Sequence, residues 1–383
     1  MHDELVERRR WIGEDRFLRA LGFCTALPGP EAQQLATYVG YSMHGARGGV
    51  IAGGLFVLPS FVLLCVLSAM YVKFGDLGAV DGIVRGLGAA VVALIAAAVI
   101  RVGRRAIRSP FGAILAILSF LLILLGLPFP LLLIPVAGIG YVVGRVRPGL
   151  LGGPGSHAAS AGAPARAAHL GWRHRLLQTG AAWLIPLASL LVIGGLVGRL
   201  AGFFTLTALV TFGGAYAVLP FVADQAVNHF HWLTADDMVA GLALGESTPG
   251  PLIIVNTFVG FLAGYTTNGT ILWGVIGASV ATLCTFVPSF VLILNGAPFI
   301  DRLKPDGPLA DMLRAITAAV VGVIAALGVF VGQNVLVDGG RPDWLPIGLA
   351  VAAFIALWRF RVGAIWVIGA CALVGLLATG VGA

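Results

Sequence analysis

Long apolar runs, each close to the length that crosses a lipid bilayer, recur along the whole of this 383-residue chain. A membrane helix needs roughly 20 such residues. Uninterrupted runs cover 50–72, 83–102, 111–127, 129–144, 179–197, 203–222, 271–294, 312–332, 344–358 and 362–379. Two further runs, 17–41 and 237–265, each contain Pro-Gly-Pro. The sequence therefore predicts an all-α polytopic membrane protein with about 12 membrane segments, two of them containing broken helices.

The composition excludes most other classes of protein. Only 11% of the residues are charged, against about 25% in soluble domains, so the chain cannot cover a water-facing surface of ordinary size. The apolar runs lack the alternation that is typical of membrane β-barrels. The net charge of +7 comes largely from arginines clustered in loops, which indicates orientation by the positive-inside rule and not nucleic-acid binding.

Neither a cofactor nor a metal is expected. Cys24, Cys65, Cys284 and Cys371 lie in apolar runs without CxxC spacing, which is typical of free thiols packed among helices. The sequence contains no GxxxxGK[ST], HExxH or GxSxG motif. ATP-driven pumping is therefore not expected of this chain, and we expect no enzyme activity.

The two halves of the chain carry matching motifs in the same order. The matched pairs are Trp11 and Trp232, Pro28-Gly29-Pro30 and Pro249-Gly250-Pro251, Pro59-Ser60-Phe61 and Pro288-Ser289-Phe290, and Arg85 and Arg314. We therefore expect two homologous repeats, at 1–145 and 199–383. Between them we expect a flexible basic linker at 146–178, rich in Gly, Ala, Pro and Ser, and an extra connecting helix at 179–198.

The relative orientation of the repeats depends on the broken segments. If each segment crosses the membrane, an odd number of spans separates equivalent points and the repeats are inverted. If the segments are re-entrant, the repeats are parallel. We favour inversion because inverted repeats with broken helices recur among transporters. Inversion places the linker, Arg361 and a predicted basic loop on the cytoplasmic side but leaves Arg8–Arg10 outside, whereas parallel repeats bring Arg8–Arg10 inside and leave Arg361 outside. The loop contains Arg101, Arg104, Arg105 and Arg108.

One helix has no counterpart in the first half. In the second half, Phe212-Gly213-Gly214 precedes Asp224, whose repeat equivalent is Asp3. The helix that should carry the first Phe-Gly-Gly would therefore precede Met1. We expect either a start codon further upstream or a naturally short protein.

The Pro-Gly-Pro motifs are the strongest candidates for a binding site. Proline removes a backbone donor and glycine frees the backbone, and such a break is costly in lipid unless it lines a cavity or is buried in protein. Pro30 and Pro251 suit the first position of a new half-helix, whose amides would point into the break and attract an anion. The alternative is a packing kink, although a repeated double-proline motif favours a function.

Polar residues near the breaks extend this candidate site. Glu31 and Glu246 are intramembrane acids that can carry a proton in coupling, or else remain neutral and hydrogen-bonded. Arg85 and Arg314 can hold an oxyanion through paired hydrogen bonds, or else reach the lipid headgroups. The other candidates are Pro28, Gly29, Pro30, Gln34, Gly213, Gly214, Thr248, Pro249, Gly250, Pro251 and Asn256. For Gly213 and Gly214, tight helix packing is the alternative role.

These motifs resemble those of the chromate ion transporter family. The resemblance rests on the segment 27–35, Trp11, Phe212-Gly213-Gly214 and the segment 248–251, and it spans nearly the whole chain. It implies a two-domain secondary transporter of the bacterial inner membrane that exports chromate, with sulfate as a structural analogue. The family is described as two halves of opposite orientation. The absent first Phe-Gly-Gly helix is a departure from its pattern.

We therefore expect a multi-pass transporter that exports chromate by alternating access and confers chromate resistance. Its expected partners are chromate or a sulfate-like oxyanion, membrane lipid, and either protons or a counter-anion, with a homodimer as one open arrangement. The alternatives are a transporter of sulfate or another oxyanion, a channel, an intramembrane enzyme acting on lipid, and a non-transporting subunit. Saturable flux that responds to a proton gradient would exclude the channel.

Overall fold

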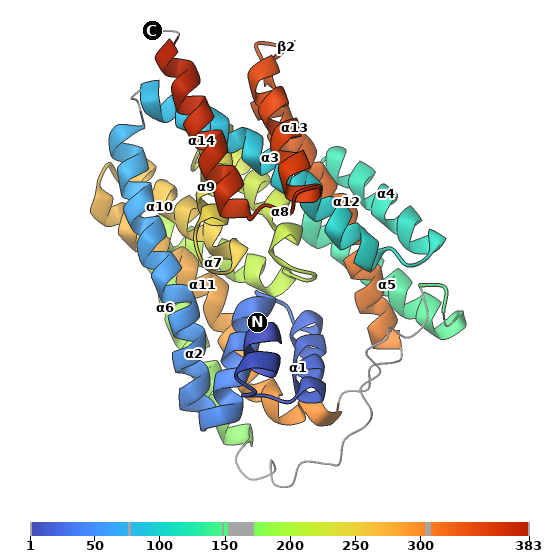
Figure 1. The fold of residues 1–383 in the computed structure, drawn as a ribbon. Helices are drawn as coiled ribbons and strands as arrows, with labels where there is room; N and C mark the ends of the chain where they lie inside the picture. Colours follow the sequence, from blue (N-terminus) through green and yellow to red (C-terminus); the bar gives the residue numbers. More distant parts are fainter. Residues whose placement is uncertain (1, 76–77, 148, 152–171, 303–307, 382–383) are drawn as a thin grey trace.

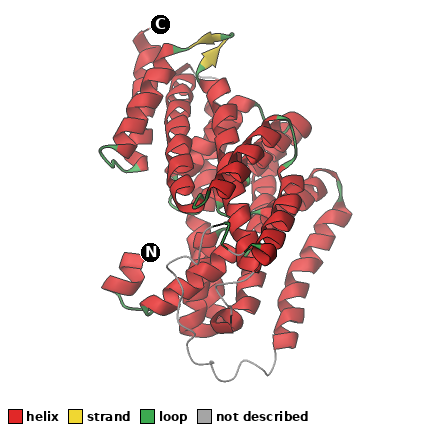
Figure 2. Cartoon of the chain, turned by 90° about the vertical axis from the view of Figure 1, so that its right-hand side faces the viewer, coloured by secondary structure: helices red, strands yellow, loops and turns green. Residues whose placement is uncertain are grey.

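The computed structural model describes residues 2–75, 78–147, 149–151, 172–302 and 308–381. Helices make up nearly all of these residues, and the exception is a short antiparallel pair, β1 (Val337–Asp338) and β2 (Arg341–Pro342) (Figure 2). Six of the helices are long and apolar enough to cross a membrane, and shorter apolar helices accompany them. The prediction of an all-α, multi-pass membrane protein is confirmed.

In the first half of the chain, helices precede and follow the break at Pro28-Gly29-Pro30. They are the π-helix η1 (Asp3–Arg8), α1 (Glu14–Ala26), α2 (Glu31–Phe74), α3 (Gly78–Ala106), α4 (Pro110–Leu124) and α5 (Phe129–Val146). α1 ends where Leu27 adopts extended backbone, and α2 begins after Pro30, which is also extended. The helix break predicted at this motif is confirmed.

In the second half of the chain, helices precede and follow the break at Pro249-Gly250-Pro251. They are α6 (Trp172–Ile193), α7 (Gly195–Val210), η2 (Ala215–Ala217), α8 (Leu219–Asp224), η3 (Gln225–His229), α9 (Ala235–Ser247), η4 (Leu252–Ile254), α10 (Val255–Asn268), α11 (Ile271–Gly296), η5 (Ala297–Arg302), α12 (Pro308–Val335), α13 (Trp344–Trp358) and α14 (Ala364–Val381). α9 stops at Ser247 and a new helix starts after Pro251, so this predicted break is confirmed too.

A third break interrupts the run 203–222, which was predicted to be one plain helix. α7 ends at Val210, and Gly213 and Gly214 follow with φ of +75° and +101°. These angles cannot continue a right-handed helix, and glycine reaches them without the steric cost that other residues meet. The prediction for this segment is therefore wrong. A further glycine, Gly194 at φ +68°, divides α6 from α7 earlier than expected.

Two other boundaries differ from the sequence prediction. α3 continues to Ala106, so Arg101, Arg104 and Arg105 belong to a helix and not to a basic loop. α6 begins at Trp172, so the last part of the range 146–178, predicted as a linker, is helical; residues 152–171 of that range lie outside the described residues. The helices extend because arginine and glutamine sustain a helix well beyond the lipid.

The long element α2 is a helical hairpin. His44 and Gly45 leave helical geometry, with Gly45 at φ +64°. A Cβ placed on Gly48 would collide with the backbone carbonyl of Gly40, which requires the chain to fold back between them. Residues 31–43 and 46–74 are therefore separate segments, as predicted. In the second half α10 crosses α11 through Gly260 and Gly277 in the same way.

The core lies where the two halves of the chain meet. α12 packs against α3, α4 and α5, while α11 packs against α2, α7 and α10. Figure 1 shows α2 and α11 side by side below the α3, α13 and α14 group. Large apolar side chains remain exposed along α4 and α6, as expected for helices that face lipid. This packing buries Gly29, Pro30, Thr211 and Pro251 at the three breaks, whereas Pro249 and Gly250 remain exposed.

Candidate functional site

The first Pro-Gly-Pro break meets the break after α7. The amide of Gly29 donates a hydrogen bond of 2.7 Å to the carbonyl of Thr211. Thr211 directly follows α7 and precedes Gly213 and Gly214. Backbone from the two halves therefore pairs where neither segment is helical, which satisfies groups that lipid would leave without partners.

Each Pro-Gly-Pro glycine faces a serine from the other half of the chain. Gly29 lies against Ser289 of α11, and Gly250 lies against Ser60 of α2. The Ser60 hydroxyl also donates a hydrogen bond to the carbonyl of Pro249. A Cβ at Gly29 or Gly250 would collide with the serine hydroxyl, and both glycines have positive φ, +122° and +155°. The motif therefore needs glycine both for conformation and for space.

Buried polar atoms without partners occur on the helices next to the two Pro-Gly-Pro breaks. Gln34 donates to the carbonyl of Pro28 at 2.8 Å, and Asn256 donates to the hydroxyl of Thr285 at 3.1 Å. Among the described residues, Gln34 Oε1, Asn256 Oδ1 and Ser289 Oγ have no hydrogen-bond partner. These side chains are at most 1% exposed. Buried polar atoms are rarely left unpaired. The two amide oxygens can only accept, so they indicate ordered water or another donor, whereas the Ser289 hydroxyl can donate to an anion.

The two predicted acids have different surroundings. Glu31 is the first residue of α2, directly after Pro30. Glu246 lies in the last turn of α9 and accepts a hydrogen bond from the hydroxyl of Tyr216, which follows the Gly213-Gly214 break. Thr248 directs its hydroxyl to the carbonyl of Gly245 and so caps α9. Glu246 is thus tied to the third break as well as to the second.

The two predicted arginines lie on α3 and α12, which pack against each other. Arg85 is exposed near the start of α3. Arg314 pairs with the buried Asp311 one turn earlier on α12, with Nη1 and Oδ1 2.7 Å apart. Neither guanidinium is among the described contacts of the two Pro-Gly-Pro motifs.

A cavity of 380 Å³ opens beside Glu246. Tyr216 and Glu246 line it together with two guanidinium groups, from Arg101 at the end of α3 and Arg361 in the turn between α13 and α14. Arg101 acts electrostatically on both Tyr216 and Glu246. The cavity therefore joins positive charge to the residues that flank two of the helix breaks.

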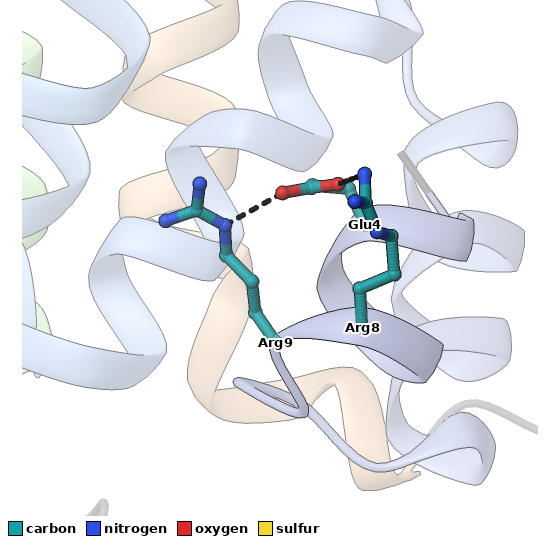
Figure 3. Close-up of polar contacts among 3 residues, drawn as sticks. All are labelled: Glu4, Arg8 and Arg9. Atoms are coloured by element: carbon teal, nitrogen blue, oxygen red, sulfur yellow. Dashed lines mark hydrogen bonds and ion pairs between the residues drawn. The ribbon is translucent and has the colours of Figure 1, made fainter.

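The N-terminal residues carry a separate charged cluster at the surface. Glu4 pairs with Arg9 at 2.7 Å and with Arg8 at 3.0 Å (Figure 3). The Arg9 guanidinium holds the pKa of the Glu4 carboxyl below its usual value, because it stabilises the ionised form. All three side chains are well exposed, so this cluster contributes little to stability.

Sequence reasoning missed five residues of this region: Ser60, Ser289, Tyr216, Arg101 and Arg361. The repeated Pro-Ser-Phe motif was a signal for the two serines, because it recurs in both halves with the same spacing to Arg85 and Arg314. No comparable signal pointed to the other three, which meet only through the packing of α3, η2 and the α13–α14 turn.

Comparison with known proteins identifies the group to which these motifs belong. The sequence model described as "Chromate transporter" matches residues 1–143 and 198–376. The chain belongs to the chromate transporter family. The resemblance drawn from the motifs is thereby confirmed. No solved structure matches the chain.

Curated relatives align over nearly the whole chain. A chromate transport protein of Pseudomonas aeruginosa is 34% identical over 98% of this chain and 85% of the relative. A probable chromate transport protein of Synechococcus elongatus is 30% identical over 94% of this chain and 84% of the relative. The chromate transport protein of Cupriavidus metallidurans is 28% identical over 99% and 87%. This chain is thus similar to proteins named as transporters.

Proposed function

We propose that this protein is a secondary active transporter that exports chromate across the bacterial inner membrane and confers chromate resistance. Its family supports chromate transport. The observation that carries the assignment of the site is the buried Ser289 hydroxyl, a donor without a partner among the described residues, which lies against Gly29 of the first break. A tetrahedral oxyanion needs several hydrogen-bond donors in a buried place, and amides at a helix break supply them without a charged side chain.

Two inverted repeats would build this site. The family model matches two separate stretches of the chain. In each half, the Pro-Gly-Pro glycine contacts a serine of the other half: Gly29 contacts Ser289, and Gly250 contacts Ser60. Each half also contains one close helix crossing at a glycine pair, Gly40–Gly48 in the first and Gly260–Gly277 in the second. Such paired contacts are expected if one module occurs twice, and they support alternating access in which one repeat rocks against the other.

Coupling would use protons or an exchanged anion. Glu31 and Glu246 flank the breaks, and acids inside a membrane protein are retained chiefly for function because they are costly there. In this proposal each carboxyl group takes up or releases a proton as the anion-bound protein changes its orientation. Arg314 is already paired with Asp311, so direct binding of the anion by Arg85 or Arg314 is the part of the proposal with least support.

Transport into everted membrane vesicles tests this function. Vesicles containing the protein should accumulate radiolabelled chromate when a proton gradient is imposed, uptake should saturate, and sulfate should compete. Vesicles without the protein are the control. Glu31→Gln and Glu246→Gln should each reduce uptake at least about tenfold, the usual scale for loss of a proton-transfer group. Uptake that neither saturates nor changes in the two variants would refute the proposal.

A transporter of sulfate or another oxyanion is the second candidate. Chromate and sulfate share charge and tetrahedral shape, and the Ser289 hydroxyl beside Gly29 would donate to either anion. Uptake of each anion in competition with the other distinguishes a chromate transporter from a sulfate transporter, because the physiological substrate should have the lower apparent KM.

A further inference from the structure

The cavity beside Glu246 contains two arginines that the sequence did not associate with each other. Arg101 lies in the last turns of α3, and Arg361 lies far along the chain between α13 and α14. Its volume, 380 Å³, is well beyond the roughly 30 Å³ that one water molecule occupies in the liquid. A small oxyanion fits there together with part of its hydration shell.

The surrounding helices hold both arginines in place. Arg104, one turn after Arg101, stacks over the ring of Trp358 with Cζ 4.7 Å from the ring centroid, which fixes the end of α3 against the end of α13. Arg361 adopts φ +53°, a left-handed conformation that is unfavourable for a residue with a Cβ. Such outliers concentrate at functional sites, where the surrounding structure maintains them.

The inner wall of the cavity leads to the helix breaks. Tyr216 belongs to η2, which follows Gly214 and packs against η4, the first turn after Pro251. Glu246 lies just before the second Pro-Gly-Pro and accepts the hydrogen bond of Tyr216. The cavity is thus lined by the two arginines and by Tyr216 and Glu246, which lie close in sequence to the third and second breaks.

We infer that this cavity is an entry site that binds a free dianionic oxyanion on its way to the breaks. The inference rests on the proposed function. Two guanidinium groups offer forked donors that match the oxygens of a tetrahedral anion. The predicted topology places Arg101 and Arg361 on the cytoplasmic side, where an exported anion must enter. Glu246 lines the same cavity, and its carboxyl group would repel an arriving anion whenever it is ionised.

Uptake kinetics in proteoliposomes of phosphatidylcholine test the entry site. Arg101→Gln and Arg361→Gln should each raise the KM for chromate about tenfold while leaving the maximal rate within about twofold, because hydrogen bonds to charged groups contribute roughly 1.5–3 kcal/mol. Arg361→Lys keeps the charge and should have an intermediate effect. The matched control is Arg359→Gln, an exposed residue of the same turn that does not line the cavity. An unchanged KM in both Gln variants would overturn the inference.

Equilibrium binding of labelled sulfate to the purified protein separates this inference from the proposed function. Arg101→Gln and Arg361→Gln should weaken binding, and Glu246→Gln should tighten it severalfold, since it removes from the cavity lining an acid that can repel the anion. Sulfate binding without chromate transport would leave the cavity assigned and refute the function. Normal chromate transport by the unsubstituted protein, together with unchanged sulfate binding in the three variants, would leave the function standing and refute the entry site. If the arginines instead hold a lipid headgroup, their substitution will affect uptake only when phosphatidylglycerol is present, and the inference fails.

Discussion

Two glycines show how single residues determine this site. Gly29 and Gly250 have positive φ and lie against serine hydroxyls, so the hydrogen atom in place of a side chain permits both the backbone turn and the contact between halves. Proline on either side removes donors and gives each break a defined start and end. The properties that make the motif costly in lipid are the ones that expose its amides.

We predict that Gly29→Ala lowers both stability and transport. The added Cβ would meet Ser289 Oγ and Gln34 Nε2, and the strain and overpacking together should cost about 1–3 kcal/mol. The expected result is a lower melting temperature of the purified protein and at least about tenfold slower chromate uptake. The control is Gly54→Ala on α2, where nothing lies within 4 Å of the new Cβ. Equal effects of the two substitutions would contradict this account.

The two serines should differ in what their loss affects. Ser60 donates a hydrogen bond to Pro249, so Ser60→Ala should lower the free energy of unfolding by about 1 kcal/mol. Ser289 Oγ has no partner among the described residues, so Ser289→Ala should leave the melting temperature nearly unchanged and raise the KM for chromate. A melting curve and an uptake titration for each variant decide between them, and a stability loss in Ser289→Ala with normal KM would show the reading to be mistaken.

At the scale of elements, close helix crossings at glycine organise each half. α10 and α11 approach so closely that a Cβ on Gly277 would collide with the carbonyl of Gly260. Without a hydrophobic drive between helices in lipid, such small residues provide the packing that holds helices together. The same device closes the α2 hairpin at Gly40 and Gly48.

We predict opposite effects for two glycine-to-alanine changes in helix interiors. Gly277→Ala should destabilise the protein by about 1–3 kcal/mol, because the crossing must open. Gly369→Ala on α14 meets nothing within 4 Å and should stabilise it by up to about 1 kcal/mol through helix propensity. Thermal unfolding in detergent measures both changes. A stabilising Gly277→Ala would mean that this crossing does not constrain the helices.

At the scale of the whole molecule, the relative orientation of the halves determines how transport can work. An inverted pair has two related conformations that open to opposite sides of the membrane, whereas a parallel pair does not. Arg47, just after the turn of the α2 hairpin, and Asn268, the last residue of α10, follow the two broken segments, and both are exposed. If the repeats are inverted, these two positions face opposite compartments.

Thiol labelling measures this orientation. A cysteine at Arg47 should react with an impermeant reagent only from the cytoplasmic side, and one at Asn268 only from the other side. The native Cys24, Cys65, Cys284 and Cys371, all free and mostly buried, are first replaced by serine or alanine. A cysteine at Ser109, in the turn after α3, serves as the cytoplasmic reference. Labelling of both positions from the same side would establish parallel repeats. Alternating access could then not be derived from inversion of the two halves.

The sequence alone determined the membrane class, most helix positions and both Pro-Gly-Pro breaks. These follow from local properties: apolar length, the missing donor of proline and the freedom of glycine. It misjudged 203–222, because a Gly-Gly pair is common inside membrane helices and only the conformation of Gly213 and Gly214 reveals a break there. It also cut α3 short, because charged residues suggest a loop even where a helix extends beyond the lipid.

Only the tertiary structure decided which groups meet at the breaks. Ser289 reaches Gly29, Ser60 reaches Gly250, and Arg101 joins Arg361 across a cavity, although each pair is far apart in the chain. Helix packing determines these contacts, and packing depends on shape complementarity between segments and not on the pattern within any one of them. The sequence identified where helices must break, and the fold determined what each break faces.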